Sequence, residues 1–264
     1  MTARAARGFD PDALGRRDPG LIRWLLPRLE WVNRRYLRLD ADGVGHLPAG
    51  PALLVANHNG GIMGPDLACT LAVLWRALGP EAPLYALAHD FAMRQLTPLG
   101  RVLQRVGAIR AARANALGAL ASGAKVLVYP GGDLDTYRSF RRRDEVVILP
   151  RTGFVDVARA AGVPIVPIVT WGAHRSAVIL TDGAAIAGRL GMPRWARLER
   201  FPVALALPWG LALGPWLPYL PLPFPIRQRI LPARMVGADE DAGAVAAAIQ
   251  ADMQAALEEL RDGR

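Results

Sequence analysis

Four short apolar runs, each about the length of one strand, constrain the fold of this chain more than any other feature of its sequence. They read PALLVAN (51–57), APLYALA (82–88), KVLVYP (125–130) and VPIVPIV (163–169). A strand that is buried on both faces of a parallel sheet is apolar along its whole length, whereas a half-exposed strand alternates. Because stretches of helical spacing separate these runs, the sequence predicts an α/β fold with a largely parallel central sheet flanked by helices.

The remaining pattern predicts one domain. We expect helices from the loop after residue 57 to about Leu78, and over Phe91–Arg105, Ala112–Ser122, Phe154–Ala161 and Asp239–Arg261, with a short strand at 106–110. A length of 264 residues suits one large α/β domain and is short for two. Residues 39–264 are therefore predicted to form a single domain, preceded by a tail and helix over 1–38.

The helix predicted within residues 21–38, LIRWLLPRLEWVNRRYLR, combines apolar clusters with arginines at roughly helical spacing, and Pro27 predicts a break in it. Trp24, Trp31 and Tyr36 beside arginines suit an amphipathic helix that faces a membrane interface. A helix that covers the domain core explains the same pattern, and both interpretations stay open.

Charge, cysteine and histidine content limit the classes of partner and cofactor that the chain can be expected to bind. The formal charge is +9, but 31 of the 32 basic residues are arginine, spread along the chain without a nucleic-acid-binding signature. We expect no nucleic acid, and a basic surface that faces anionic lipid headgroups or an acidic acyl carrier. The single cysteine, Cys69, excludes an intrachain disulfide, and four scattered histidines at no ligand spacing predict neither a metal nor a cofactor.

The densest cluster of unusual residues, NHNGGIMGPD (57–66), directly follows the first strand. Asn57 and His58 lie where open α/β sheets place ligands and chemistry, at the carboxyl end of a strand. Asp66, brought back to His58, would orient the imidazole and favour its protonated form. Asp66 as a helix N-cap and His58 as an ordinary hydrogen-bonded residue are the alternatives.

Three further blocks make the chain resemble the lysophospholipid and glycerolipid acyltransferase superfamily over roughly residues 40–230. Its blocks occur here in order as NHNGGIMGPD (57–66), GAIRAAR (107–113), YPGGDLDTYR (129–138) and VPIVPI (163–168). The resemblance implies transfer of a fatty acyl group from acyl-CoA or acyl carrier protein to a lipid hydroxyl. His58 would act as general base, oriented by Asp66, in a direct attack without an acyl-enzyme.

The same resemblance assigns substrate-binding roles to residues of the first three blocks. Gly107 and Arg113 would shape the acceptor pocket, and the turn formed by Pro130, Gly131 and Gly132 can present backbone N–H groups to an oxyanion or carbonyl. The substrate-binding residues would further include Asn57, Asp133 and Arg138. His174, after the last strand, is a weaker candidate for the same crevice.

Two departures from the family pattern bear on the acceptor. Seven residues separate His58 from Asp66, where the family usually has four, and PGGD replaces the glutamate-containing third block. The Gly-Gly form resembles relatives of diacylglycerol acyltransferases. Asp133 and Asp135 there predict a neutral acceptor because they would repel a phosphomonoester, unless Arg113 and Arg138 neutralise them. Lysophosphatidate acyltransfer and a non-catalytic lipid-binding protein remain alternatives.

The segment between Arg200 and Arg227 carries no charged residue and contains seven prolines. Its length would span a bilayer as a helix, but that proline content argues against one. We expect an irregular segment that lines an acyl pocket, enters the membrane interface or does both, with a buried part of the core as the alternative. Since residues 1–20 lack the apolar core of a secretory signal, the expected location is peripheral, on the cytoplasmic face of a membrane.

Overall fold

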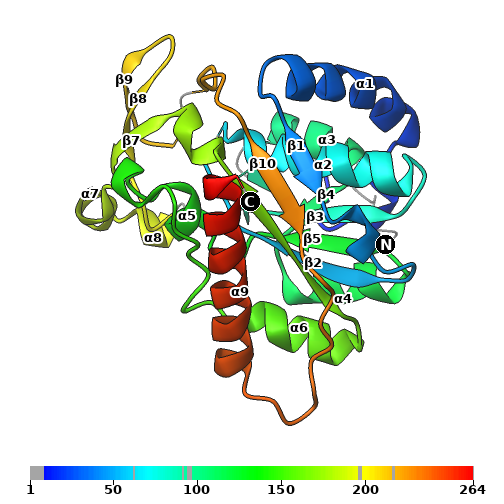
Figure 1. Ribbon diagram of the computed structural model, residues 1–264. Coiled ribbons are helices and arrows are strands. Elements are labelled where there is room, and N and C mark those ends of the chain that lie inside the picture. The colour runs from blue at the N-terminus through cyan, green and yellow to red at the C-terminus, as the bar shows by residue number, and fades with distance from the viewer. Residues whose placement is uncertain are drawn as a thin grey trace, which may run out of the picture.

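The computed structural model describes residues 9–61, 63–90, 92–93, 97–195, 198–215 and 218–263. In this part of the chain, a seven-stranded sheet has the strand order β1-β10-β6-β2-β5-β3-β4 (Figure 1). Its strands are β1 (Asp40–Asp42), β2 (Ala52–Ala56), β3 (Leu84–Ala88), β4 (Ala108–Arg110), β5 (Lys125–Val128), β6 (Ile165–Trp171) and β10 (Arg227–Ile230). A smaller three-stranded sheet holds β7 (Val178–Thr181), β8 (Val203–Ala206) and β9 (Gly210–Leu213).

The helices alternate with the strands of the large sheet. They are α1 (Pro19–Arg35), α2 (Pro65–Leu78), α3 (Thr97–Arg105), α4 (Arg113–Ala121), α5 (Gly132–Thr136), α6 (Gly153–Ala161), α7 (Ala184–Arg189), α8 (Met192–Trp195) and α9 (Ala242–Asp262). Short 3-10 helices occupy Leu14–Arg16, Val44–His46, Phe140–Arg142 and Ala173–Ser176. The helix predicted over Phe91–Arg105 is observed from Thr97 onward, and part of its earlier half lies outside the described residues.

The predicted α/β fold with a largely parallel sheet is confirmed. The four apolar runs form β2, β3, β5 and β6, and β2 pairs in parallel with both β5 and β6. Among the described strands of the large sheet, β10 alone pairs antiparallel, with β6, and β1 pairs along its other edge. Because β2 lies between β5 and β6, the loops that follow these three strands meet at one edge of the sheet.

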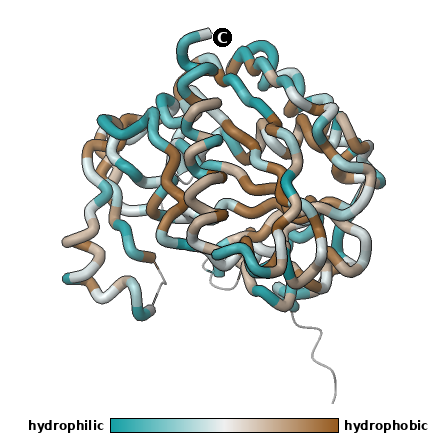
Figure 2. Tube along the Cα trace, turned by 60° about the horizontal axis from the view of Figure 1, so that its bottom comes forward, coloured by the Kyte–Doolittle hydropathy of each residue, from teal (hydrophilic) through white to brown (hydrophobic). Residues whose placement is uncertain are grey.

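Each face of the sheet buries its own hydrophobic core. Leu53 and Val55 of β2 pack with residues of α4, α6 and α9, whereas Leu54 and its alternating neighbours pack with α1 and α2. Figure 2 shows the central strands as the hydrophobic interior beneath more hydrophilic helices. Full burial of one Leu or Val side chain stabilises the fold by about 1.5–3 kcal/mol, so β2 contributes to the stability of both layers.

The predicted break at Pro27 is wrong, because α1 runs through it without interruption. Asp18 caps the helix by accepting a hydrogen bond from the N–H of Leu21. Ile22 and Leu26 are buried in the same core cluster as residues of α2, and this packing holds the helix across the proline. Trp24 and Trp31 remain exposed. One side of α1 therefore covers the core, and its membrane contact stays a prediction.

The apolar segment between Arg200 and Arg227 is more regular than expected, because it contains the antiparallel hairpin β8–β9. The hairpin adds to β7 and projects from the body of the molecule (Figure 1). Among the described residues, no helix combines the length and apolarity needed to cross a membrane.

Candidate active site

The loop after β2 is anchored to the neighbouring strand by its first residue. The side-chain amide of Asn57 donates to the carbonyl of Thr170 on β6 at 3.0 Å, and its oxygen accepts the N–H of Thr170 at 2.8 Å. Asn57 is fully buried. Its predicted contact with substrate is therefore wrong, since its side chain instead fixes the point at which the loop leaves the sheet.

His58 and Asp66 form the pair that the sequence predicts. The Nδ1 atom of His58 lies 2.8 Å from Oδ2 of Asp66, which also accepts the N–H of Asn59 at 2.9 Å. Because a carboxylate accepts at Nδ1, that nitrogen carries the proton and Nε2 is left with a free lone pair. Asp66 is fully buried in the first turn of α2, where the helix dipole favours a negative charge, while the His58 side chain is 25% exposed.

Glycines let the chain turn back across the seven residues between His58 and Asp66. Gly60 and Gly61 have φ values of +81° and +73°, which residues other than glycine rarely adopt. A Cβ on Gly60 would also stand 2.6 Å from the carbonyl oxygen of Ala173. The extra loop residues thus allow the carboxylate to return to the imidazole.

Charge around His58 favours its protonated form. Burial alone lowers the pKa of His58, but the Asp66 carboxylate raises it by charge and by the hydrogen bond, and Asp135 raises it further. The net pKa lies above the ordinary 6.5 of histidine, although the Arg138 charge opposes the shift. A raised pKa makes the imidazole a stronger proton acceptor, which suits a general base.

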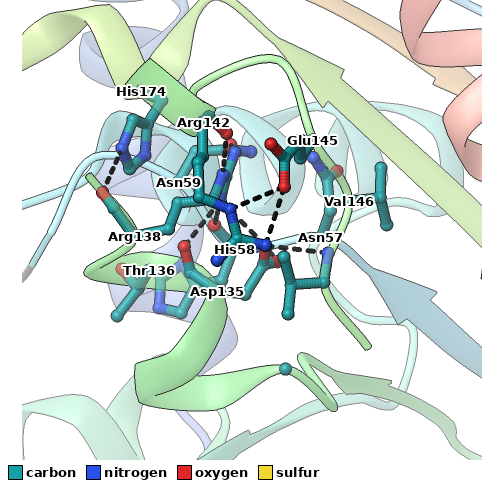
Figure 3. Close-up of polar contacts among 12 residues, drawn as sticks. Asn57, His58, Asn59, Asp135, Thr136, Arg138, Arg142, Glu145, Val146 and His174 are labelled. Carbon is teal, nitrogen blue, oxygen red and sulfur yellow. Dashed lines mark hydrogen bonds and ion pairs between the residues drawn. The ribbon is translucent and has the colours of Figure 1, made fainter. Parts of the chain in front are cut away.

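A buried ion pair holds the backbone of His58 from both sides. Asp135, on α5, accepts the His58 N–H at 2.5 Å through Oδ2, while its Oδ1 lies 2.8 Å from Nη1 of Arg138. The same Nη1 donates to the carbonyl of His58 at 2.8 Å, and Nη2 donates to Oδ1 of Asn59. Both charged side chains are essentially inaccessible to solvent. We call this pair the backbone clamp; Figure 3 shows it around His58.

The backbone clamp corrects the role predicted for Arg138. Its guanidinium is 1% exposed and donates to His58, Asn59, Asp135 and two further carbonyls, so it offers no donor to a substrate. Burial raises the pKa of Asp135, and the charge of Arg138 acts against that shift. The third block therefore positions the loop that carries His58.

His174 completes the support of the loop. Its Nδ1 accepts the N–H of Gly60 at 3.0 Å, so its Nε2 carries the proton and donates to the carbonyl of Arg138 at 2.8 Å. Burial, and then the Arg138 charge, hold the pKa of His174 well below its usual range, so the ring is neutral. His174 thus lies against the loop that carries His58, and its ring braces that loop. The ring of Tyr129 packs beside His58 at a centroid distance of 4.6 Å.

The turn after β5 offers fewer donors than predicted. Pro130 has no N–H, and the N–H of Gly132 is taken by the carbonyl of Tyr129 at 3.1 Å. Within the described part of the chain, the N–H of Gly131 is left without a hydrogen-bond partner. The oxyanion role of this turn stays a prediction, and it rests on the N–H of Gly131.

Asp133 is also turned away from substrate. It is buried, pairs with Arg151 at 2.8 Å and accepts the N–H of Glu199 at 2.6 Å. Since Arg138 neutralises Asp135 in the same way, the predicted repulsion of a phosphomonoester by these two carboxylates does not hold.

The second block lies apart from His58. Gly107 precedes β4 at the amino end of the strand, at the opposite edge of the sheet from His58. Its φ of +97° explains why a glycine occupies this position. Arg113 is exposed in the first turn of α4, after the carboxyl end of β4. β4 lies three strands from β2, about 14 Å at the usual spacing between strands. The structure therefore does not bring Gly107 to the site, and it places Arg113 at the same edge without contact to His58.

Asn59, Asp135 and His174 are the supporting residues that sequence reasoning missed or underrated. The one local signal was the spacing of Asp135 and Arg138, which places both on one face of a helical turn. The contacts of Asp135 and Arg138 with His58 span 77 and 80 residues, and nothing in the sequence indicates that these residues meet.

Comparisons with known proteins show the family and the fold of the chain. Uncharacterized proteins of Mycobacterium bovis and Mycobacterium leprae are 30% and 29% identical to the chain over 219 and 215 residues, which is 78% of this chain but 58% and 56% of theirs. The chain thus spans little more than half the length of these relatives. The crystal structure of the 1-acyl-sn-glycerophosphate acyltransferase PlsC from Thermotoga maritima shares the fold, with a TM-score of 0.55, 15% identity, and coverage of 90% of this chain and 81% of that one. Residues 38–171, which contain all four sequence blocks, match the family model described as Acyltransferase. The chain belongs to the acyltransferase family.

Proposed function

We propose that the protein is an O-acyltransferase that moves a fatty acyl group from acyl-CoA or acyl carrier protein to the hydroxyl of a lipid acceptor, at the cytoplasmic face of a membrane. The observation that carries this proposal is the pair of His58 and Asp66. It combines a partly exposed imidazole, a buried orienting carboxylate and a free Nε2 at the carboxyl end of the central strand.

The pair supports a one-step acyl transfer. Nε2 of His58 accepts the proton of the acceptor hydroxyl as its oxygen attacks the thioester carbon. The C–S bond then breaks, and the proton passes from the imidazolium to the leaving thiolate, which gives an ester and a free thiol. Asp66 stabilises the imidazolium in between, and we assign the contact to the carbonyl oxygen to the N–H of Gly131, for which the described residues hold no acceptor.

The arginines near the site support a neutral acceptor. Arg138 is buried and uses its donors within the fold, and Arg151 pairs with Asp133 and donates to the carbonyl of Gly131. A phosphomonoester needs an unpaired cation or several donors to offset the loss of its hydration. We therefore propose a diacylglycerol, a monoacylglycerol or a long-chain alcohol as acceptor, in place of lysophosphatidate.

Product analysis tests the proposal. Purified protein is incubated with palmitoyl-CoA or palmitoyl-acyl carrier protein and with each of diacylglycerol, monoacylglycerol, hexadecanol and lysophosphatidate, and mass spectrometry identifies the esters. We expect an ester with a neutral acceptor, and a rate at least about 10²-fold lower for His58→Ala and for the closer-sized His58→Gln.

Each failure has a distinct meaning. Ester formation with none of these donors and acceptors would overturn the transferase assignment, and near-normal rates in both His58 variants would overturn the role of His58. A preference for lysophosphatidate greater than about tenfold, or roughly 1.4 kcal/mol of transition-state discrimination, would overturn the neutral acceptor alone.

A further inference from the structure

The hairpin β8–β9 exposes large side chains and buries small ones. Along β8 and β9 the buried positions hold Ala204, Ala206 and Ala212, each at most 8% exposed. The exposed positions between them carry Leu205, Leu207, Leu211 and Leu213, at 46–54%, and Trp209 at the tip is 50% exposed. A sheet in water normally has the reverse arrangement, with its larger apolar residues inside. We call these five exposed residues the leucine face.

Further exposed apolar residues continue the leucine face beyond the hairpin. The N–H of Leu220 donates to the carbonyl of Leu207 at 2.8 Å, which joins the segment after the hairpin to it. Leu220 and Phe224 are 56% and 41% exposed. Since no residue between Arg200 and Arg227 is charged, this surface can leave water without stripping an ion of its hydration.

The leucine face is attached directly to the loop that carries His58. Tyr219, next to Leu220, is buried and donates its hydroxyl to the carbonyl of Gly60. A small cavity is lined by Gly61 from that loop and by Ala204 and Ala212 from the inner side of the hairpin. A lipid held against the outer side is therefore one sheet away from the catalytic loop.

Arginines flank the other end of this surface. The hydroxyl of Tyr36 donates to the carbonyl of Pro221 at 2.7 Å, and Arg38 donates to the carbonyl of Pro223 at 2.7 Å. These bonds place the end of α1, with its exposed Arg34 and Arg35, beside the segment that continues the leucine face. Apolar residues bordered by arginines match the two layers of an anionic leaflet, its acyl chains and its charged headgroups.

We propose that the leucine face is a membrane-docking surface that enters the acyl-chain layer of an anionic bilayer leaflet. The proposal rests on the proposed function, because a lipid acceptor has to reach His58 from a bilayer, and it names the surface through which the protein meets that bilayer. A second copy of the chain, pairing along β9 as the open edge of the small sheet, is the competing occupant.

Vesicle binding tests the proposal without any need for turnover. The full chain, Leu205→Ser/Leu211→Ser and the control Met235→Ser are floated with vesicles of phosphatidylcholine alone or with phosphatidylglycerol added. Leu205 and Leu211 pair across the hairpin, and Met235, on the chain segment before α9, is at least as exposed as either leucine, at 58%. We expect the wild-type protein and the control to prefer the anionic vesicles, and the partition coefficient of the double variant to fall at least about tenfold because two leucine side chains no longer enter lipid.

Two further measurements separate the outcomes. Near-ultraviolet circular dichroism confirms that the double variant is folded, and acyl transfer from octanoyl-CoA to a water-soluble alcohol reports on the site without a bilayer. Unchanged vesicle binding of the folded double variant would overturn the docking surface, whether or not transfer is seen. Lost binding with transfer intact supports it, and lost binding with no transfer in any variant supports the surface while the proposed function fails. A wild-type dimer by light scattering that becomes a monomer in the double variant, without vesicle binding by either, would assign the face to a second copy.

Discussion

The two ring nitrogens of His58 lie in different surroundings, and this difference gives the residue its chemistry. Nδ1 is tied to a buried carboxylate, whereas the ring keeps a quarter of its surface open. A histidine free to rotate would offer either nitrogen to a substrate. Here the carboxylate fixes both the tautomer and the direction of the basic lone pair.

Asp66→Asn is expected to slow acyl transfer and to move its pH dependence. The base works only when His58 is neutral, so kcat/KM falls as the pH drops through the raised pKa of His58. Because the variant removes the charge that raises this pKa, the acidic limb should shift to lower pH, and the plateau should fall less than in His58→Ala. A pH–rate profile of kcat/KM measures both effects. An acidic limb that stays in place would show that Asp66 does not act on the base.

At the scale of elements, the backbone clamp joins α5 to the loop after β2. Variants of the clamp can distinguish its contribution to stability from its contribution to catalysis. Asp135→Asn leaves Arg138 buried without its counter-charge, which typically costs about 3–5 kcal/mol. The double variant Asp135→Leu/Arg138→Met removes both charges and should regain most of that stability. It should not regain activity, because the N–H and carbonyl of His58 lose their partners.

Urea unfolding and acyl-transfer rates measure the two properties of the clamp variants side by side. Arg142→Met is the control, because Arg142 is an exposed arginine of the same segment that pairs with Glu145. A double variant with wild-type turnover would show that the clamp serves stability alone.

The sequence predicted the elements whose residues all share one environment. β2, β5 and β6 are apolar runs because the inner strands of a parallel sheet are covered on both faces, and β3 was found by its apolar residues although most of them are only partly buried. β10 was missed because Arg227–Ile230 is mostly polar and gains its strand geometry from pairing with β6. The hairpin β8–β9 was missed because its nearby prolines suggested an irregular segment.

In the candidate site, contacts between residues close in sequence were predictable and contacts between distant residues were not. His58 and Asp66 are eight positions apart, and a glycine-rich loop between them predicts their contact. Arg138 and His174 contact that loop only once the sheet has brought distant segments together. As an arginine and a histidine they were expected to contact substrate, and their burial could not be predicted from the sequence.

For the molecule as a whole, His174 links the stability of the fold to pH. Its native pKa lies well below 6.5, so below about pH 6.5 the unfolded chain binds a proton that the native protein does not. Stability from this residue is therefore present above that pH and is lost as the pH falls. His174→Gln can keep an acceptor for Gly60 and a donor for Arg138 but does not titrate.

We expect the free energy of unfolding of the wild type to fall by up to about 2 kcal/mol more than that of His174→Gln between pH 7 and pH 5. Urea denaturation at both pH values measures the difference, in which titrations common to both proteins cancel. Equal losses would mean that His174 binds its proton equally well in the native protein.

The position of β2 between β5 and β6 also sets the order in which the protein can become active during its synthesis. A ribosome that has completed α4 has already made His58 and Asp66, but neither of the strands that flank β2. Arg138 follows β5, and His174 follows β6. The histidine is thus made early and positioned late, since contacts so distant in sequence form slowly. A nascent chain interrupted before β6 carries His58 and Asp66 but lacks Thr170 and His174, which fix the loop between them, so we expect translation cut short at that stage to yield no partly active enzyme.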